Sequence, residues 1–415
     1  MRSQMPLAVD GSIPNESYKK AQMSMTNPRS VIKPSRRVAV LVDTSTSWGR
    51  RIIEGLHQYE SEHSRWQLFV EPRGVEQRRW LPPGWTGDGV IARVGFPELA
   101  EQLQKLGLPV VNVSGIELPG VDFPRVITNQ KEAARMAADH FLNSGFRHFG
   151  YFSLLGLDYV AEHQQTFRAI AEAEGFDCSL YAAASLLGAA ESDWMIDLDR
   201  VVEWLVSLPK PVAILTWNTG SARELLYACA AAGMKVPEEV SVMSGSDDDL
   251  FCKVAPVPIS AVNPAAEEIG FRAAERLDQL MNRKRASGRK DILIPPLGVV
   301  TRQSTETLAV EDPCLVKALR YIREDPARAM RVSDVAAHAG LCRRALEQRF
   351  LRILGRSPAS EIRRVRIERA IDLLQRTKLP VSVVAEKSGF STAEYMASVF
   401  RSQFDAAPMS FRKRE

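Results

Sequence analysis

The sequence predicts an α/β body of two doubly wound lobes, followed by an all-α domain that contains two helix-turn-helix units. Three observations predict it. The chain has 415 residues, too many for one ordinary core. Apolar runs of strand length alternate with amphipathic helical segments from Arg37 to about residue 300, and everything after Asp312 has helical spacing. Residues 313–415 carry a net charge of +10, against −6 for the rest of the chain.

The strands of the α/β body are continuous apolar runs, which favour parallel sheets covered on both faces. We place the first lobe at about 36–128 and the second at about 129–258, and expect a helix over 261–284 and strands within 291–301 to complete both lobes, giving one domain over 36–303. The predicted strands are 38–42, 66–71, 89–94, 109–114, 148–153, 211–217 and 240–245.

The N-terminal segment 1–35 is polar and lacks the apolar core of a secretion signal, so we expect a disordered tail and a cytoplasmic protein. No apolar run of 18 residues is present, so no membrane partner is expected. The five cysteines lack CxxC spacing and are predicted to be free thiols. We expect no metal, cofactor or catalytic residue.

Residues 304–312 read as a polar linker, after which Asp312 and Pro313 suit the N-cap and first turn of a helix. A basic block of domain size is typical of a protein that binds a polyanion. The alternative is a solvated basic surface.

The first predicted helix-turn-helix unit covers 332–354, with Ser333 as a helix cap and Gly340 in the turn. Its second helix should bury Ala345, Leu346, Phe350 and Ile353 and present Arg343, Arg344, Glu347 and Gln348 outward. A helix that begins near Pro358 links this unit to the next.

The second unit covers 381–404, with Gly389 in the turn because a tight turn needs a residue that tolerates positive φ. Its second helix should bury Tyr395, Met396, Val399, Phe400 and Phe404. For base contacts we single out Arg343, Arg344, Gln348 and Glu394. For phosphate contacts we single out Arg363, Arg364, Arg401, Arg412 and Lys413. A solvated surface role is the alternative for Glu394 and for each phosphate candidate.

Residues 313–415 resemble the AraC-type DNA-binding domain, and the stretch that carries the resemblance is ERAIDLLQRTKLPVSVVAEKSGFSTAEYMASVFRSQFDAAPMSFRKR. Met396 stands where an aromatic residue is common. The resemblance implies two recognition helices that contact double-stranded DNA.

Polar and aromatic side chains follow several predicted strands, where two doubly wound lobes place their ligands. Carboxylate, amide and guanidinium groups beside indole rings suit a sugar. Alternatives stay open: the tryptophans could be core, Asp247 could cap a helix, and Arg93 could pair with the acidic run. The candidates are Trp48, Arg93, Trp194, Asn218, Ser246 and Asp247.

Residues 37–303 resemble the LacI/GalR type of periplasmic-binding-protein-like sensor, on the stretches VAVLVDTSTSWGRRIIEGL, GDGVIA, LPVVNVSG, VPEEVSVMSGSDDD and LIPPLGVVTRQST. By this resemblance Asp247 and Asn218 bond sugar hydroxyls, and Trp48 or Trp194 stacks on the ring. The chain departs from the family at Asn129, where Asp is usual, at His163, where Arg is common, and at Arg93.

Together the two resemblances imply a homodimeric transcription regulator that binds an operator and responds to a small sugar, a pentose such as D-xylose, in control of a sugar catabolism operon. The residues leave open whether it activates or represses. The alternative is a Rossmann-like enzyme acting on a small sugar or nucleotide, but GxGxxG, GxxxxGK[ST], GxSxG and HExxH are absent. A transport-type solute binder is a third reading, for which the N-terminus offers no export signal.

Overall fold

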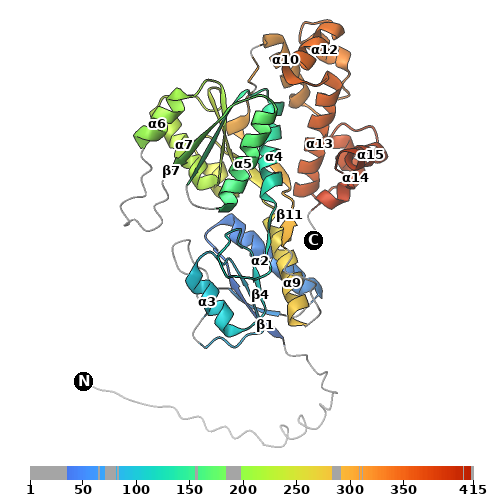
Figure 1. Ribbon diagram of the computed structural model, residues 1–415. Helices are drawn as coiled ribbons and strands as arrows, with labels where there is room; N and C mark the ends of the chain where they lie inside the picture. Colours follow the sequence, from blue (N-terminus) through green and yellow to red (C-terminus); the bar gives the residue numbers. More distant parts are fainter. Residues whose placement is uncertain are drawn as a thin grey trace, which may run out of the picture.

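A computed structural model describes residues 35–63, 66–70, 81, 84–154, 158–183, 198–282, 291–307, 309–310, 312–404 and 406–412. Two α/β lobes are followed by a helical domain that lies beside the second lobe (Figure 1). The predicted fold class is confirmed. The predicted tail lies outside the described residues except for Ser35.

The first lobe has a four-stranded parallel sheet in the order β2-β1-β3-β4. Helix α9 packs along α2 and shares the core on one face of this sheet. The elements are β1 (Arg36–Leu41), α2 (Ser47–His63), β2 (Trp66–Val70), β3 (Gly89–Ala92), α3 (Pro97–Leu106), β4 (Val110–Asn112) and α9 (Ala266–Met281).

The second lobe has a six-stranded sheet in the order β12-β10-β9-β8-β6-β7, parallel except for the pairing of β12 with β10. Separate cores cover its two faces. The elements are α4 (Gln130–Asn143), β6 (His148–Leu154), α5 (Asp158–Ala173), β7 (Cys178–Ala183), α6 (Leu198–Ser207), β8 (Val212–Thr216), α7 (Thr219–Ala231), β9 (Val240–Ser244), α8 (Asp249–Val254), β10 (Ser260–Asn263), β12 (Gly298–Val300) and the 3-10 helix η1 (Gln303–Thr305).

The chain passes between the lobes three times: from β5 (Val126–Thr128) to α4, from β10 to α9, and from β11 (Ile292–Ile294) to β12. Strands β5 and β11 pair in parallel as a separate two-stranded sheet. The sequence analysis missed β5, β7 and β10. It predicted helix from Ala261, which is wrong for the first residues: 260–263 pairs in the sheet, and Ala265 has φ 58°, so the helix begins at Ala266.

The helical domain begins at α10 (Pro313–Glu324), whose predicted N-cap is confirmed because Asp312 accepts from the backbone N–H groups of Cys314 and Leu315. Two cores share the long helix α13, as predicted for a rigid linking helix. The remaining elements are α11 (Val332–His338), α12 (Arg343–Leu354), α13 (Pro358–Arg376), α14 (Val381–Lys387), α15 (Ala393–Phe404) and the 3-10 helix η2 (Pro408–Phe411).

Two details of the helix-turn-helix predictions are wrong. Ser333 does not cap α11, because the helix starts one residue earlier and the Asp334 carboxylate accepts from the Arg331 N–H at 2.8 Å. On α15 the buried residues are Met396 and Phe400, whereas Tyr395 is 47% exposed and Phe404 is 38% exposed. The exposed surface of α15 is therefore more aromatic than expected.

Gly340 and Gly389 end α11 and α14 with positive φ, 69° and 80°, so either turn disfavours a side chain. They differ in their surroundings: a Cβ at Gly340 meets nothing within 4 Å, whereas one at Gly389 falls 2.1 Å from the carbonyl oxygen of Pro326. The second unit is thus pressed against the loop that precedes the first.

Gly340→Ala should therefore lower the free energy of opening of its unit by about 1 kcal/mol, the cost of a left-handed residue. Gly389→Ala should cost at least ~2 kcal/mol more, because backbone must also move. Hydrogen exchange of 332–354 and 381–404 in the full chain measures both. Equal losses in the two variants would show that the Pro326 contact contributes nothing.

Candidate ligand-binding and nucleic-acid interfaces

The two lobes meet where β1 and β9 end. At the start of α2, the backbone N–H of Ser47 donates to Asp248 Oδ2 at 3.2 Å. The Ser47 hydroxyl donates to the carbonyl of Asp247 at 3.3 Å. The carboxyl ends of strands from both sheets therefore face one another, the arrangement in which open α/β sheets place their ligands.

Three buried polar atoms near these strand ends have no hydrogen-bond partner among the described residues: Asp43 Oδ2, Asp248 Oδ1 and Nε2 of His163, whose ring lies beside Gly245 after β9. Asp43 follows β1, and its other oxygen accepts from the N–H and hydroxyl of Ser45 at 3.0 and 2.7 Å. A buried polar atom without a partner costs about 1–3 kcal/mol. A ligand rich in hydroxyl groups can satisfy all three.

His163 lies on α5 and is fully buried. Its Nδ1 is 2.7 Å from the Tyr151 hydroxyl, and its ring meets the Trp217 ring edge-on at 5.5 Å. Burial lowers the pKa of His163 to about 3, so the imidazole is neutral at physiological pH. When Nδ1 accepts from Tyr151, Nε2 carries the proton and is the donor of the junction.

Sequence reasoning missed Asp43 and Asp248 and named His163 only as a departure from a family pattern. The available signal for Asp43 was its position directly after a continuous apolar strand, the same signal that led to Trp48 five residues later.

Of the predicted ligand residues, the structure brings Trp48 and Arg93 together. The Arg93 guanidinium lies 5.6 Å from the centre of the Trp48 ring, within the range of a cation–π contact. Trp48 is half-buried against the first-lobe core. The acidic run 247–249 pairs with Arg302 instead of the suggested Arg93.

Asp247 is 3% exposed, and its Oδ1 accepts from Arg302 at 2.9 Å. Arg302 also donates to Asp249 Oδ1 at 3.2 Å and to the Ile259 carbonyl at 2.8 Å. The suggestion that Asp247 caps a helix is wrong, since Asp248 precedes α8 and its side chain makes no cap bond. Asp247 thus supports the strand ends, while Asp248 presents the unpaired oxygen.

Asn218 caps α7, with Oδ1 accepting from the Ser221 N–H at 2.9 Å, which leaves its amide NH₂ as the group that can donate to a ligand. The Ser246 carbonyl accepts from the hydroxyls of Thr219 and Ser244 at 2.8 and 2.6 Å, so Ser246 braces the loop after β9. Trp194 lies outside the described residues.

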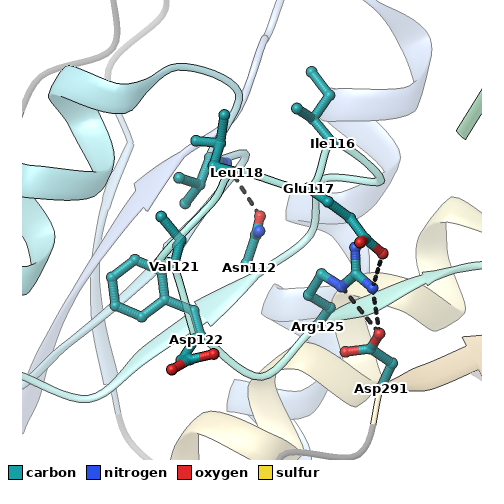
Figure 2. A pocket seen from close by; sticks show the side chains of 10 residues that line it. Asn112, Ile116, Glu117, Leu118, Val121, Asp122, Arg125 and Asp291 are labelled. Carbon is teal, nitrogen blue, oxygen red and sulfur yellow. Dashed lines mark hydrogen bonds and ion pairs between the residues drawn. The ribbon is translucent and has the colours of Figure 1, made fainter. Parts of the chain in front are cut away.

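A separate cavity of about 180 Å³ opens at the ends of β3 and β4 (Figure 2). Arg125 bonds Asp291 at 2.5 Å and Glu117 at 2.6 Å, and Asn112 accepts from the Val94 and Ser114 N–H groups. These polar side chains therefore have hydrogen-bond partners within the protein. Because Arg125 and Asp291 precede β5 and β11, the cluster braces the paired crossing strands.

On the helical domain, Arg343, Arg344 and Gln348 are exposed on α12, as the prediction of base contacts requires. Arg343 is already paired with Glu347 at 2.8 Å, which leaves Arg344 and Gln348 as the side chains better placed to contact bases. Glu394 and Arg401 are exposed on α15. Exposed Tyr395, missed because helical spacing counted it as buried, lies beside Glu394.

The predicted phosphate-contact residues differ in their exposure and in their partners. Arg363 and Arg401 are exposed. Arg364 is 16% exposed and pairs with Glu361 at 2.7 Å and Glu368 at 2.5 Å, so it is not available to phosphate and that prediction is wrong. Half-buried Arg412 donates to the Leu379 carbonyl, which anchors the C-terminal segment. Lys413 lies outside the described residues.

Within the described part of the chain, no helix is long and apolar enough to cross a bilayer, and no group of His, Cys, Asp or Glu suits a metal ion. All five cysteines are free; four are buried or half-buried as expected, whereas Cys342 is exposed.

Comparison with known proteins matches three domain families along the chain: an XylR N-terminal domain over 37–129, a periplasmic binding protein-like domain over 138–305, and a helix-turn-helix domain over 335–414. The xylose operon regulatory protein of Haemophilus influenzae is 28% identical over 91% of this chain and 98% of its own length. The xylose operon regulatory protein of Escherichia coli K12 is 27% identical over 91% of this chain and 96% of its own length. A solved structure of a xylose-binding transcription activator, XylR, is 26% identical with a TM-score of 0.59, and covers 92% of this chain and 98% of its own.

The depressed pKa of His163 makes the sensor sensitive to acid. The unfolded histidine titrates near 6.5 and the folded one near 3, so the stabilising contribution is complete above pH 6.5 and is lost as the pH falls toward 3. Between pH 6.5 and 5 the loss from His163 is about 2 kcal/mol.

His163→Gln should remove this part of the pH dependence, whereas His57→Gln, a change at an exposed histidine, should leave it intact. Urea unfolding followed by tryptophan fluorescence measures it, because all seven tryptophans precede residue 313. An identical loss of stability on acidification in the wild type and His163→Gln would contradict a neutral buried imidazole.

Proposed function

We propose that this chain, a DNA-binding transcription regulator that resembles the xylose operon regulatory proteins along nine-tenths of its length, is controlled by a small sugar bound between the lobes of its sensor. It is a regulator and not an enzyme. The observation that carries the proposal is that Asp43 Oδ2, Asp248 Oδ1 and His163 Nε2 are buried near the strand ends and have no hydrogen-bond partner among the described residues.

Two carboxylate oxygens and one imidazole suit a polyol. The carboxylates accept from hydroxyl groups, and the imidazole N–H donates to a hydroxyl or ring oxygen. Half-buried Trp48 and Trp217 supply aromatic surface for the apolar face of the sugar ring. The relatives are a xylose operon regulatory protein and a xylose-binding transcription activator, which supports a pentose, with D-xylose as the first candidate.

Asn218 joins this site through its amide NH₂. Asp247 contributes indirectly, since its ion pair with Arg302 fixes the loop that carries Asp248. Asn129, another departure from the family pattern, caps α4 by accepting from the Glu132 N–H at 3.2 Å, so a helix cap is kept although Asn replaces the usual Asp.

The sugar acts by stabilising one arrangement of the lobes. The Ser47 contacts to Asp247 and Asp248 form only when the lobes are close, and a ligand that bonds Asp43 on one lobe and Asp248 on the other favours that closed state. A ligand shifts such an equilibrium by its differential affinity for the two states.

On the DNA side, α12 and α15 are proposed to enter successive major grooves on one face of the duplex, about 34 Å apart. Arg344 and Gln348 contact base edges, and Arg363 and Arg401 contact phosphates. The regulator works as a homodimer on its operator in the cytoplasm, where the operon it controls lies.

A thermal-shift screen with D-xylose, L-arabinose and D-ribose tests the sugar site. The correct sugar at 100 times its Kd should stabilise the wild type by about 2.7 kcal/mol. Asp43→Asn and Asp248→Asn should each weaken binding by about tenfold or more, the value of a hydrogen bond to a charged group. Asp199→Asn, at an exposed carboxylate on α6, is the matched control. The proposal fails if no sugar stabilises the protein, or if both junction variants respond as the wild type does.

Fluorescence anisotropy with a duplex that the full chain selects from a random pool tests the DNA contacts. Arg344→Ala should weaken DNA binding by about 1–3 kcal/mol and relax the sequence preference at one base pair. Arg363→Ala should weaken binding to all sequences equally and lower the slope of log affinity against log salt concentration by about 1. Arg369→Ala, whose guanidinium pairs with Asp372 on the same helix, should change neither. Equal sequence preference in Arg344→Ala and the wild type would remove α12 as a base-reading helix.

A further inference from the structure

We propose that Arg356 couples the sensor to the DNA-binding domain, by holding the end of helix α4 in one state of the sensor and releasing it in the other. This inference rests on the proposed function and names the contact through which its signal passes. Arg356, Asn143 and Glu361 are called the Arg356 clasp below.

The clasp joins residues 213 positions apart in the sequence. The Arg356 guanidinium donates from Nη1 to Asn143 Oδ1 at 3.0 Å and from Nη2 to the Asn143 carbonyl at 2.5 Å. Its Nε donates to Glu361 Oε2 at 2.7 Å. One side chain thus bonds the last residue of a sensor helix and the first turn of α13 together.

The backbone fixes Arg356 from both sides. Gly355 ends α12 in the left-handed conformation, with φ 66°, and Ser357 caps α13 by accepting from the Ser360 N–H at 3.1 Å. A residue between a helix end and a helix cap has little freedom of its own. A shift of Asn143 is therefore passed to α12 and α13 instead of being absorbed by a flexible loop.

The ion pair between Arg356 and Glu361 is the part of the clasp that stays formed in both states. It is fully buried and pairs with Arg364 at 2.7 Å and Arg323 at 3.8 Å as well as with Arg356. Although burial raises the pKa of Glu361, the bonds and charges of these arginines lower it to about 2, so the carboxylate stays ionised. Arg356 can exchange Asn143 for water while it keeps Glu361, and only the sensor side of the clasp then opens.

Helix α4 connects the clasp to the moving part of the sensor. The residue before it, Asn129, donates from its backbone N–H to the Ile294 carbonyl of β11, at the crossing between the lobes. Its last residue is Asn143. Figure 1 shows α4 beside the long helix α13, with the crossing strand β11 below it. Under the proposal, a rotation of the lobes acts on the first residues of α4 through this bond, and the resulting shift of the helix moves Asn143 relative to Arg356.

Part of the interface between the sensor and the helical domain is a cavity. A cavity of about 660 Å³ lies between sensor residues such as His140 and Ser144 and domain residues such as Tyr321 and Arg323. The Ala309 N–H bonds the Ser144 carbonyl at 3.0 Å beside it. Interfaces of this polar kind between domains of one chain permit relative motion, so a few hydrogen bonds at the clasp can decide the orientation of the domain.

The test compares the Kd of the full chain for its selected duplex with and without saturating D-xylose. In the wild type the ratio should fall within the usual 5–150-fold range of allosteric coupling. Arg356→Lys, which keeps the charge but loses the fork, should bring the ratio at least threefold closer to 1 while the D-xylose thermal shift is unchanged. Asn143→Asp, which adds an ion pair to the clasp, should change the ratio by a similar factor.

Arg135→Gln on α4 and Arg369→Gln on α13 are the controls, because each arginine is exposed and pairs within its own helix. They should keep the wild-type ratio. A purely structural clasp would lower the melting temperature of Arg356→Lys and leave the ratio intact, and that result overturns the inference.

If no tested sugar changes the Kd of the wild type for DNA, the proposed function fails. Small-angle scattering then tests whether the Arg356 clasp holds the DNA-binding domain against α4. Arg356→Lys should increase the radius of gyration of the full chain relative to both controls, because the domain is released from α4. An unchanged radius would overturn the clasp by itself.

Discussion

The three crossings between the lobes constrain everything else in the sensor. The lobes can move only about the segments that follow β5, β10 and β11, and the Arg125–Asp291 pair braces the two parallel crossing strands near their first residues. Such hinge-restricted motion brings the strand ends of both sheets together or apart as a unit. Helix α4 starts at one of these crossings and ends at the DNA-binding domain, so it joins the two parts of the chain that the proposed coupling must connect.

Burying polar atoms without hydrogen-bond partners at the junction costs free energy, which a hydroxyl-bearing ligand can offset. Asp43 and Asp248 each use one carboxylate oxygen within the protein and leave the other buried and unpaired, and His163 does the same with its two nitrogens. Natural proteins accept such unsatisfied groups mainly where function requires them. Asp247 and Asp249, by contrast, pair with Arg302, so these carboxylates have a charged partner within the chain.

Much of this architecture could be predicted because each local pattern agrees with its neighbours. The apolar runs gave the central strands, the Asp312–Pro313 pair gave the start of α10, and the two turn glycines gave the helix-turn-helix units. The misses have physical causes. Strands β5, β7 and β10 are short or lie near sheet edges, so composition marks them weakly, and the spacing of Tyr395 could not reveal that Met396 and Phe400 already fill the core. Arg364 pairs with Glu361 in a cluster in which three arginines surround one buried carboxylate. The spacing of these residues in the sequence does not predict such a cluster.

A crystal structure of the full chain with D-xylose tests the central claim most directly. The account predicts one sugar at the junction of β1 and β9, with its hydroxyl groups at hydrogen-bonding distance from Asp43 Oδ2, Asp248 Oδ1 and His163 Nε2. A sugar bound elsewhere, or one at the junction that leaves those three atoms unpaired, would contradict it.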